Sequence, residues 1–185
     1  MTPLIVFGVI VLAIVLMYNS LISKKNQVDN IFAGIDAVLK KRYNLIPNLV
    51  SSVQQYMKHE REILEKVTEL RAQAMQPGIS DAQKIELDRQ ITSMLGSIMV
   101  AVENYPELKA NENVMHLQRT LTEIEAQIAA ARRAYNQAVT DYNNAIEMIP
   151  TNILANMMHY TRKEVFSIPD EQRKNVDVKA LFKQQ

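Results

Sequence analysis

The sequence predicts an all-α protein, on three observations. Strong helix formers such as Lys, Glu, Gln, Ala, Leu and Met dominate, while Gly is limited to 4 residues and Trp is absent. Apolar residues recur in steps of three and four along most of the chain, which is the period of an amphipathic helix. The chain also begins with an apolar run that is long enough to cross a membrane. We therefore expect one transmembrane helix that continues into an antiparallel up-and-down helical bundle.

These patterns divide the chain into three parts. Residues 1–23 are predicted to form a transmembrane anchor, and residues 24–149 the helical bundle. Residues 150–185 are predicted to form a C-terminal amphipathic segment followed by a polar, at most partly ordered tail. The roughly 160 residues that follow the anchor have the usual size of one domain with its own core.

The anchor is predicted from an unbroken apolar run at residues 4–18, which extends to residue 22 and then covers 19 residues. At about 1.5 Å per residue this is roughly 28 Å of helix, close to the thickness of a bilayer core. A cleaved signal peptide is the main alternative. We favour a retained anchor because the positive charges follow the apolar core and no small-x-small cleavage site is present. Residues 4–22 are thus expected to lie in the bilayer.

The orientation follows from the distribution of positive charge. No Lys or Arg precedes the span, whereas Lys24 and Lys25 follow it directly, and Lys40, Lys41 and Arg42 lie at the far edge of the relevant range. The positive-inside rule therefore predicts that the N-terminus is outside and the C-terminal domain is cytoplasmic.

The first amphipathic stretch leaves one boundary open, at Pro47. Lys40, Lys41 and Arg42 suit a helix C-terminus, Asn44 is a good N-cap, and Pro47 then falls in the first turn of a new helix. This favours an αα-hairpin and a bundle of four helices. The alternative is three long helices, the first kinked at Pro47, because the hydrophobic phase continues across the proline.

The next break lies at residues 75–80, which contain Pro77-Gly78 and end in the capping residue Ser80. A helix from there is predicted to end before Pro106, and the last long helix is predicted to end at Pro150. This last helix keeps a 3,4 alternation over five heptads, which is typical of a coiled-coil seam or of the core face of a bundle. We take the bundle as the base case and expect a homo-oligomer from the long seam.

Two Tyr-Asn pairs lie one heptad apart on this helix: Tyr135-Asn136 and Tyr142-Asn143. Each pair would place Tyr in the seam and Asn beside it. A side-chain hydrogen-bond ladder that fixes the register is the simpler interpretation. The alternative is a polar surface for a partner helix, so these four residues are the candidate partner or packing surface.

The segment at residues 151–166 combines apolar and basic residues. In an up-and-down bundle of four helices the last helix ends beside the membrane, so this segment could place its apolar face in lipid. The alternative is a short helix that caps the open end of the bundle. The candidate membrane-contact residues are Lys24, Lys25, Ile153, Leu154, Met157 and Met158.

The sequence contains no pattern that predicts catalysis. His59, His116 and His159 are isolated, and the run at residues 59–62 lacks the second histidine that an HExxH zinc helix requires. Cysteine is absent, and no Gly-rich phosphate loop or GxSxG motif is present. A net charge of +1 argues against nucleic acid. We therefore predict no catalytic, cofactor-binding or metal-binding residues and no small-molecule substrate.

Several motifs resemble those of the LemA family of bacterial membrane proteins, in order over about residues 18–182. They are NQVDNIF at 26–32, LKKRYNLIPNLV at 39–50, Tyr56 with His59-Glu60, YPELKANE at 105–112, ARRAYN at 131–136 and PTNILA at 150–155. Two places depart from the family pattern. Met148-Ile149 stand where the family favours Phe before the proline, and Met158-His159-Tyr160 stand where it favours Phe-Gly-Phe.

The resemblance implies an N-terminal anchor in the bacterial plasma (inner) membrane, a cytoplasmic bundle of four helices and no known catalytic activity. It supplies no functional residue. With the patterns above, it leads us to expect a single-pass membrane-anchored scaffold or adaptor that organises protein partners, still unknown, or itself. The alternative is a membrane-remodelling or lipid-binding protein that acts through Lys24, Lys25 and the C-terminal amphipathic segment.

Overall fold

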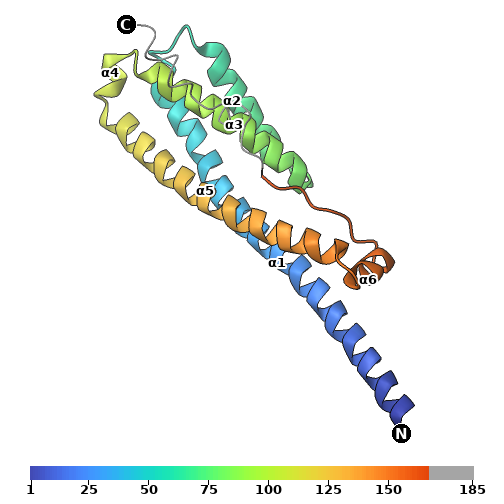
Figure 1. The fold of residues 1–185 in the computed structure, drawn as a ribbon. Coiled ribbons are helices and arrows are strands. Elements are labelled where there is room, and N and C mark those ends of the chain that lie inside the picture. Colours follow the sequence, from blue (N-terminus) through green and yellow to red (C-terminus); the bar gives the residue numbers. More distant parts are fainter. Residues whose placement is uncertain (167–185) are drawn as a thin grey trace, which may run out of the picture.

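A computed structural model describes residues 1–166 of the chain, and the predicted tail at residues 167–185 lies outside the described residues. The described part is all-helical, as predicted, and contains no strand. Its helices are α1 Thr2–Val53, α2 Arg61–Ala74, α3 Asp81–Val102, α4 Pro106–Lys109, α5 Glu112–Glu147 and α6 Thr151–Met157. Figure 1 shows α1 and α5 side by side, with α2 and α3 paired beyond them and the first part of α1 projecting alone.

The 52-residue helix α1 is exposed over its first part and packs against the other helices over the rest. The apolar side chains of residues 4–16 are exposed, whereas Leu21 is buried and from Val28 onward a side chain is buried at least every three or four residues. This buried stripe runs through Val28, Ile35 and Leu39 and faces the rest of the molecule. α1 is the only described helix that is long and apolar enough to cross a membrane. The predicted anchor and the first bundle helix are thus one continuous helix.

The hairpin predicted at Asn44 and Pro47 is wrong, because α1 continues through Pro47 to Val53. A proline inside a helix removes the N–H that would bond to the carbonyl four residues earlier, which here belongs to Tyr43. The structure supplies another donor, since Nε of Arg71 on α2 lies 2.8 Å from that carbonyl oxygen. The chain turns instead at residues 54–60, before α2 begins.

The later boundaries follow local capping chemistry. The Ser80 side chain accepts a hydrogen bond from the backbone N–H of Gln83, whose side chain accepts one from the Ser80 N–H, which forms a capping box for α3. The Asn111 side chain accepts from two backbone N–H groups at the start of α5. α5 packs along α1 for much of its length, and α6 folds back against both helices. The core is therefore assembled mainly around α1 and α5.

Candidate functional site

A buried guanidinium lies at the centre of the helical core. Arg42 on α1 is only 1% exposed, and its NH1 group lies 2.8 Å from Oε2 of Glu125 on α5. NH1 also lies 2.9 Å from Oγ1 of Thr92 on α3, and NH2 pairs with the carboxylate of Asp88 on the same helix. Arg42 thus connects α1 to both α3 and α5 through charged hydrogen bonds, which are the strong ones in proteins.

A second arginine completes this charge cluster. Arg132 on α5 pairs with the other carboxylate oxygen of Asp88, and its NH1 lies 3.9 Å from Oε1 of Glu125. Two arginines and two carboxylates therefore compensate each other, and Asp88 is completely buried. Burial lowers the pKa of Arg42, while the carboxylate of Glu125 opposes that change. This pairing joins α1, α3 and α5 through buried charges.

Sequence reasoning missed this cluster. The sequence pattern places Arg42 in the same phase as the apolar residues of α1, but it was interpreted as a basic residue at a helix end and was not paired with a buried carboxylate. Asp88 likewise falls in the buried phase of α3, between Ile85 and Ile91. Two opposite charges at buried positions of neighbouring helices were the signal that could have revealed the pair.

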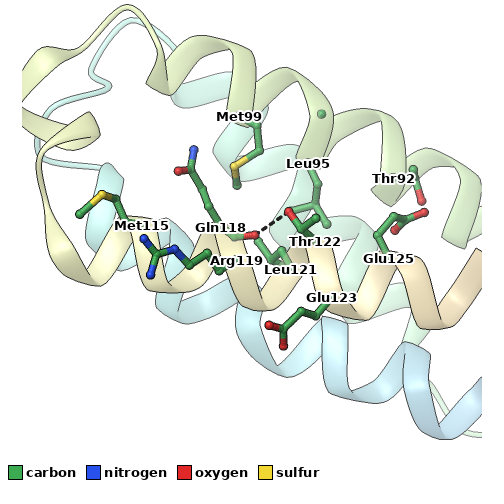
Figure 2. Close-up of a pocket in the computed structure, with 11 residues that line it drawn as sticks. Thr92, Leu95, Met99, Met115, Gln118, Arg119, Leu121, Thr122, Glu123 and Glu125 are labelled. Atoms are coloured by element: carbon green, nitrogen blue, oxygen red, sulfur yellow. Dashed lines mark hydrogen bonds between the residues drawn. The ribbon is translucent and has the colours of Figure 1, made fainter.

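A groove of about 890 Å³ lies between α3 and α5 (Figure 2). Its lining includes apolar side chains from both helices and the polar side chains of α5, and Glu125 joins it to the charge cluster. The lining residues are Thr92, Leu95, Gly96, Met99, Met115, Gln118, Arg119, Leu121, Thr122, Glu123 and Glu125. Within residues 1–166 no group of His, Asp and Glu side chains is arranged to hold a metal ion. The groove therefore offers apolar contact and hydrogen bonds, without a metal site.

The two predicted asparagines hold the end of the described chain. Nδ2 of Asn143 donates to the Lys163 carbonyl at 2.9 Å, and the Lys163 N–H donates back to Oδ1 of Asn143 at 3.0 Å. Asn136 does the same with the backbone of Phe166, at 2.9 and 2.8 Å. We call Asn136 and Asn143 the asparagine clamp, and residues 160–166 the strap.

The spacing of the clamp matches an extended chain. Asn136 and Asn143 are seven residues apart on α5, or about 10.5 Å along the helix axis. Lys163 and Phe166 are three residues apart, which is about 10 Å in an extended segment. The strap therefore runs antiparallel to α5, and each asparagine meets the backbone N–H and C=O of one strap residue. Tyr142 adds a third contact, since its hydroxyl donates to the Thr161 carbonyl at 3.1 Å.

Aromatic packing fixes the end of the strap. The buried ring of Phe166 lies edge-on to Tyr135, with ring centroids 5.3 Å apart, and the guanidinium of Arg132 lies 5.5 Å from the Phe166 ring centroid. Phe32 of α1 packs on Tyr135 from another side, at 5.5 Å. Burial, followed by the negative charges of Asp81, Asp29 and Glu164, raises the pKa of Tyr135 to about 12. The strap thus covers the charge cluster with an aromatic ring.

The candidate partner residues therefore contact the chain's own strap. Tyr135, Tyr142 and Asn143 are buried, and Asn136 is half-buried. A side-chain hydrogen-bond ladder was predicted at these positions. In the structure the side chains of both asparagines form hydrogen bonds with the backbone of the strap. A partner surface at these positions stays a prediction.

The candidate membrane-contact residues divide into two groups. On α6, Ile153 and Met157 are 60% and 72% exposed, whereas Leu154 and Met158 pack against the core. Lys24 and Lys25 are half-buried on α1, where Lys25 lies 3.7 Å from Asp29. Because α6 packs on α1 and α5, it both covers the core and leaves an apolar face exposed.

The fold and the site define an all-helical, membrane-associated protein with one exposed apolar helix and a buried charge cluster. The chain belongs to the LemA family, whose family profile matches residues 31–180. It is 28% identical over 163 residues to Protein LemA of Metamycoplasma hominis, covering 88% of this chain and 74% of that protein. The predicted family resemblance is thus confirmed.

Magnetosome proteins are a second group of relatives. The chain is 24% identical over 178 residues to Magnetosome protein MamQ 2 of Paramagnetospirillum magneticum, and 22% identical over the same length to Magnetosome protein MamQ of Magnetospirillum gryphiswaldense. Each alignment covers 83% of this chain and 65% of the relative.

Proposed function

We propose that this protein is a single-pass, membrane-anchored helical scaffold or adaptor without catalytic activity, which organises protein partners or itself at the membrane. Its N-terminus lies outside a bacterial plasma membrane and its bundle lies in the cytoplasm, as the positions of Lys24 and Lys25 indicate. The names of the MamQ relatives, which are magnetosome proteins, support a role at a membrane.

One observation carries this proposal, the continuity of α1. The exposed apolar segment and the buried stripe that begins at Leu21 belong to the same helix, with no break between them. A continuous helix transmits position and orientation, at about 1.5 Å per residue, so the bundle is held at a defined height above the bilayer. A junction of this kind suits a scaffold, because it fixes where the surfaces of the bundle lie relative to the membrane.

The shared orientation of anchored copies supports self-association as well. In Figure 1, α1, α2, α3 and α5 alternate in direction, which agrees with an antiparallel up-and-down arrangement. The seam predicted on the 36-residue helix α5 packs inside the bundle, so self-association uses another surface. Helices held parallel in one membrane meet at the same height in every copy, so a homo-oligomer can form without tilting any of them.

The test alters the junction between the anchor and the bundle and identifies the proteins that lie next to the bundle. A photo-crosslinking residue at Val100, which is 70% exposed on α3, captures partners in cells, and mass spectrometry identifies them. A flexible Gly-Ser insertion after Ser23 uncouples the bundle from the anchor. A seven-residue helical insertion at the same place adds about two turns and so keeps the rotational orientation of the bundle about the axis of α1. We expect the flexible insertion to reduce the crosslinks more than the helical one. The same partners, captured equally well without residues 1–22, would contradict the proposal.

A second candidate function is membrane remodelling or lipid binding. It is favoured by the apolar surface at the end of α5 and on α6, where Ile149, Ile153 and Met157 are 83%, 60% and 72% exposed. This surface lies at the end of the bundle from which the anchor emerges (Figure 1). Lys24 and Lys25 lie on the same stretch of α1 and add positive charge for anionic headgroups.

Fluorescence in lipid bilayers tests this second candidate. The chain has no cysteine, so Ile153→Cys labels one site with an environment-sensitive dye. Lipid contact predicts quenching by brominated lipids in a reconstituted bilayer, and no quenching at the control site Val100→Cys. If the dye at Ile153→Cys is quenched no more than the dye at Val100→Cys, the lipid-binding function is rejected and α6 is only a cap of the bundle.

A further inference from the structure

The asparagine clamp binds backbone, and all of its groups come from α5. Each asparagine exchanges two hydrogen bonds with one strap residue, Asn143 with Lys163 and Asn136 with Phe166, at 2.8 to 3.0 Å. This is the pairing that one strand offers another at the edge of a sheet, made here by side-chain amides. The clamp therefore accepts an extended segment whether that segment belongs to the same copy or to another copy of the chain.

The strap also carries side-chain contacts that fit this chain in particular. Lys163 pairs with Asp29 of α1, Arg162 pairs with Glu147 of α5, and the Phe166 ring fills the site beside Tyr135. A second copy of the chain offers every one of these contacts unchanged. An unrelated peptide would have to reproduce the same charges and the same aromatic residue at the same spacing.

The hinge that connects the strap to α6 is strained. His159 has φ 54, the left-handed conformation that costs a residue with a Cβ free energy. It closes α6 with a Schellman motif, in which Tyr160 N–H donates to the Ala155 carbonyl and His159 N–H donates to the Asn156 carbonyl. Glycine usually occupies this position. A strained hinge between an element and its binding site favours exchange of that element between copies, because the exchanged form can relax the hinge.

We propose that straps exchange between two copies, so that residues 160–166 of each copy occupy the asparagine clamp of the other. The exchange makes an isologous dimer in which each clamp keeps its hydrogen bonds. Membrane anchoring favours it, because parallel copies carry their clamps at the same height and are confined to two dimensions, which raises their effective concentration. This inference rests on the self-association proposed above and names the segment that produces it.

Crosslinking between two tagged copies tests the exchange. One copy carries Glu147→Cys and the other Arg162→Cys, two exposed positions that form an ion pair when a strap occupies a clamp. Both copies are expressed together in the full-length, otherwise cysteine-free form and treated in membranes with a short bis-maleimide. The expected result is a crosslinked product that contains both tags. The matched control pairs Arg162→Cys with Val100→Cys on α3, which should give no such product.

Two variants probe the hinge and the clamp. His159→Gly relieves the strain of the closed form, so the yield of two-tag product should fall by about fivefold or more. Asn136→Asp replaces the donor to the Phe166 carbonyl with an acceptor, so it should weaken strap binding within one copy and between copies. A chain that carries both Glu147→Cys and Arg162→Cys reports strap binding within one copy, and its crosslink should persist in the His159→Gly background.

Each remaining outcome overturns the exchange. An efficient crosslink within one chain, with no two-tag product, means that each strap stays on its own copy. If light scattering in detergent still gives a dimer in that case, the copies associate through another surface and the scaffold proposal survives. A monomer without two-tag product would reject self-association as well. A crosslink from Glu147→Cys to a different protein, without two-tag product, would identify the clamp as a site for another partner.

Discussion

Nε of Arg71 on α2 lies 2.8 Å from the backbone carbonyl oxygen of Tyr43 on α1. That carbonyl is the acceptor that loses its helical donor because residue 47 is a proline. A side chain from the neighbouring helix thus replaces a missing backbone N–H and allows α1 to continue to Val53. The contact also joins α2 to α1 close to the charge cluster around Arg42. The length of α1 therefore depends on a tertiary contact as well as on local sequence.

A double-mutant cycle tests this relationship. Arg71→Met leaves the Tyr43 carbonyl without a donor, which should lower the free energy of unfolding by about 1–2 kcal/mol. In a Pro47→Ala background the backbone N–H of residue 47 is restored, so the same substitution should cost clearly less. Chemical unfolding in detergent, followed by circular dichroism, measures all four proteins. Additive effects of the two substitutions would mean that Arg71 stabilises the protein in another way.

Periodicity and capping predicted the parts of the fold that depend on local sequence. The apolar run, the break at residues 75–80 and the capping residue Ser80 lie where the sequence predicts them. The hairpin at Pro47 was wrong because local chemistry cannot reveal that Arg71, distant in sequence, supplies the missing donor.

The candidate site was predictable only in part. The two Tyr-Asn pairs were recognised from their heptad spacing, but their binding to the strap depends on how the chain folds back after α6. The charge cluster was missed because its members are far apart in the chain. Arg42 precedes Asp88 by 46 residues and Glu125 by 83.

The charge cluster makes a strong prediction about Arg42. Replacing it with Met leaves the fully buried Asp88 with Arg132 as its only ion-pair partner among the described residues and should cost about 3–5 kcal/mol of unfolding free energy. Adding Asp88→Leu removes the uncompensated carboxylate, so the double variant should be more stable than Arg42→Met alone. The control is Arg61→Met, since Arg61 pairs with Glu65 on an exposed helix face. A double variant no more stable than Arg42→Met would contradict this account.

The left-handed backbone at His159 predicts a stabilising substitution. His159→Gly should raise the free energy of unfolding by about 0.5–1 kcal/mol, because glycine adopts φ 54 without the steric cost of a Cβ. The reverse change at Gly78, with φ 82, is the matched control. Space for a Cβ is open there, so Gly78→Ala should destabilise through backbone strain alone. Chemical unfolding of both variants provides the comparison, and a loss of stability in His159→Gly would refute the strain.

The proposed orientation can be tested with single cysteines. Ser80 is unsuitable because it caps α3, whereas Gln76 is exposed in the preceding turn. If the bundle is cytoplasmic, Gln76→Cys should resist a membrane-impermeant thiol reagent in intact cells and react after lysis. Thr2→Cys, on the other side of the span, should react in both. Labelling of Gln76→Cys in intact cells would place the bundle outside.

Tyr135 predicts how stability changes at alkaline pH. Burial, with nearby carboxylates, raises its pKa from 10.0 to about 12 in the folded protein, so the folded state holds the phenolic proton more tightly than the unfolded state. The contribution of this residue is therefore fully present below pH 10 and is lost as the pH rises toward 12 and beyond. The loss amounts to about 2 kcal/mol by pH 12. Tyr135→Phe has no proton to lose, so its unfolding free energy should fall less steeply over this range. Lysines titrate alike in both proteins, so the difference between the two curves of unfolding free energy against pH isolates Tyr135. Parallel curves would show that ionisation of its phenol is not coupled to folding.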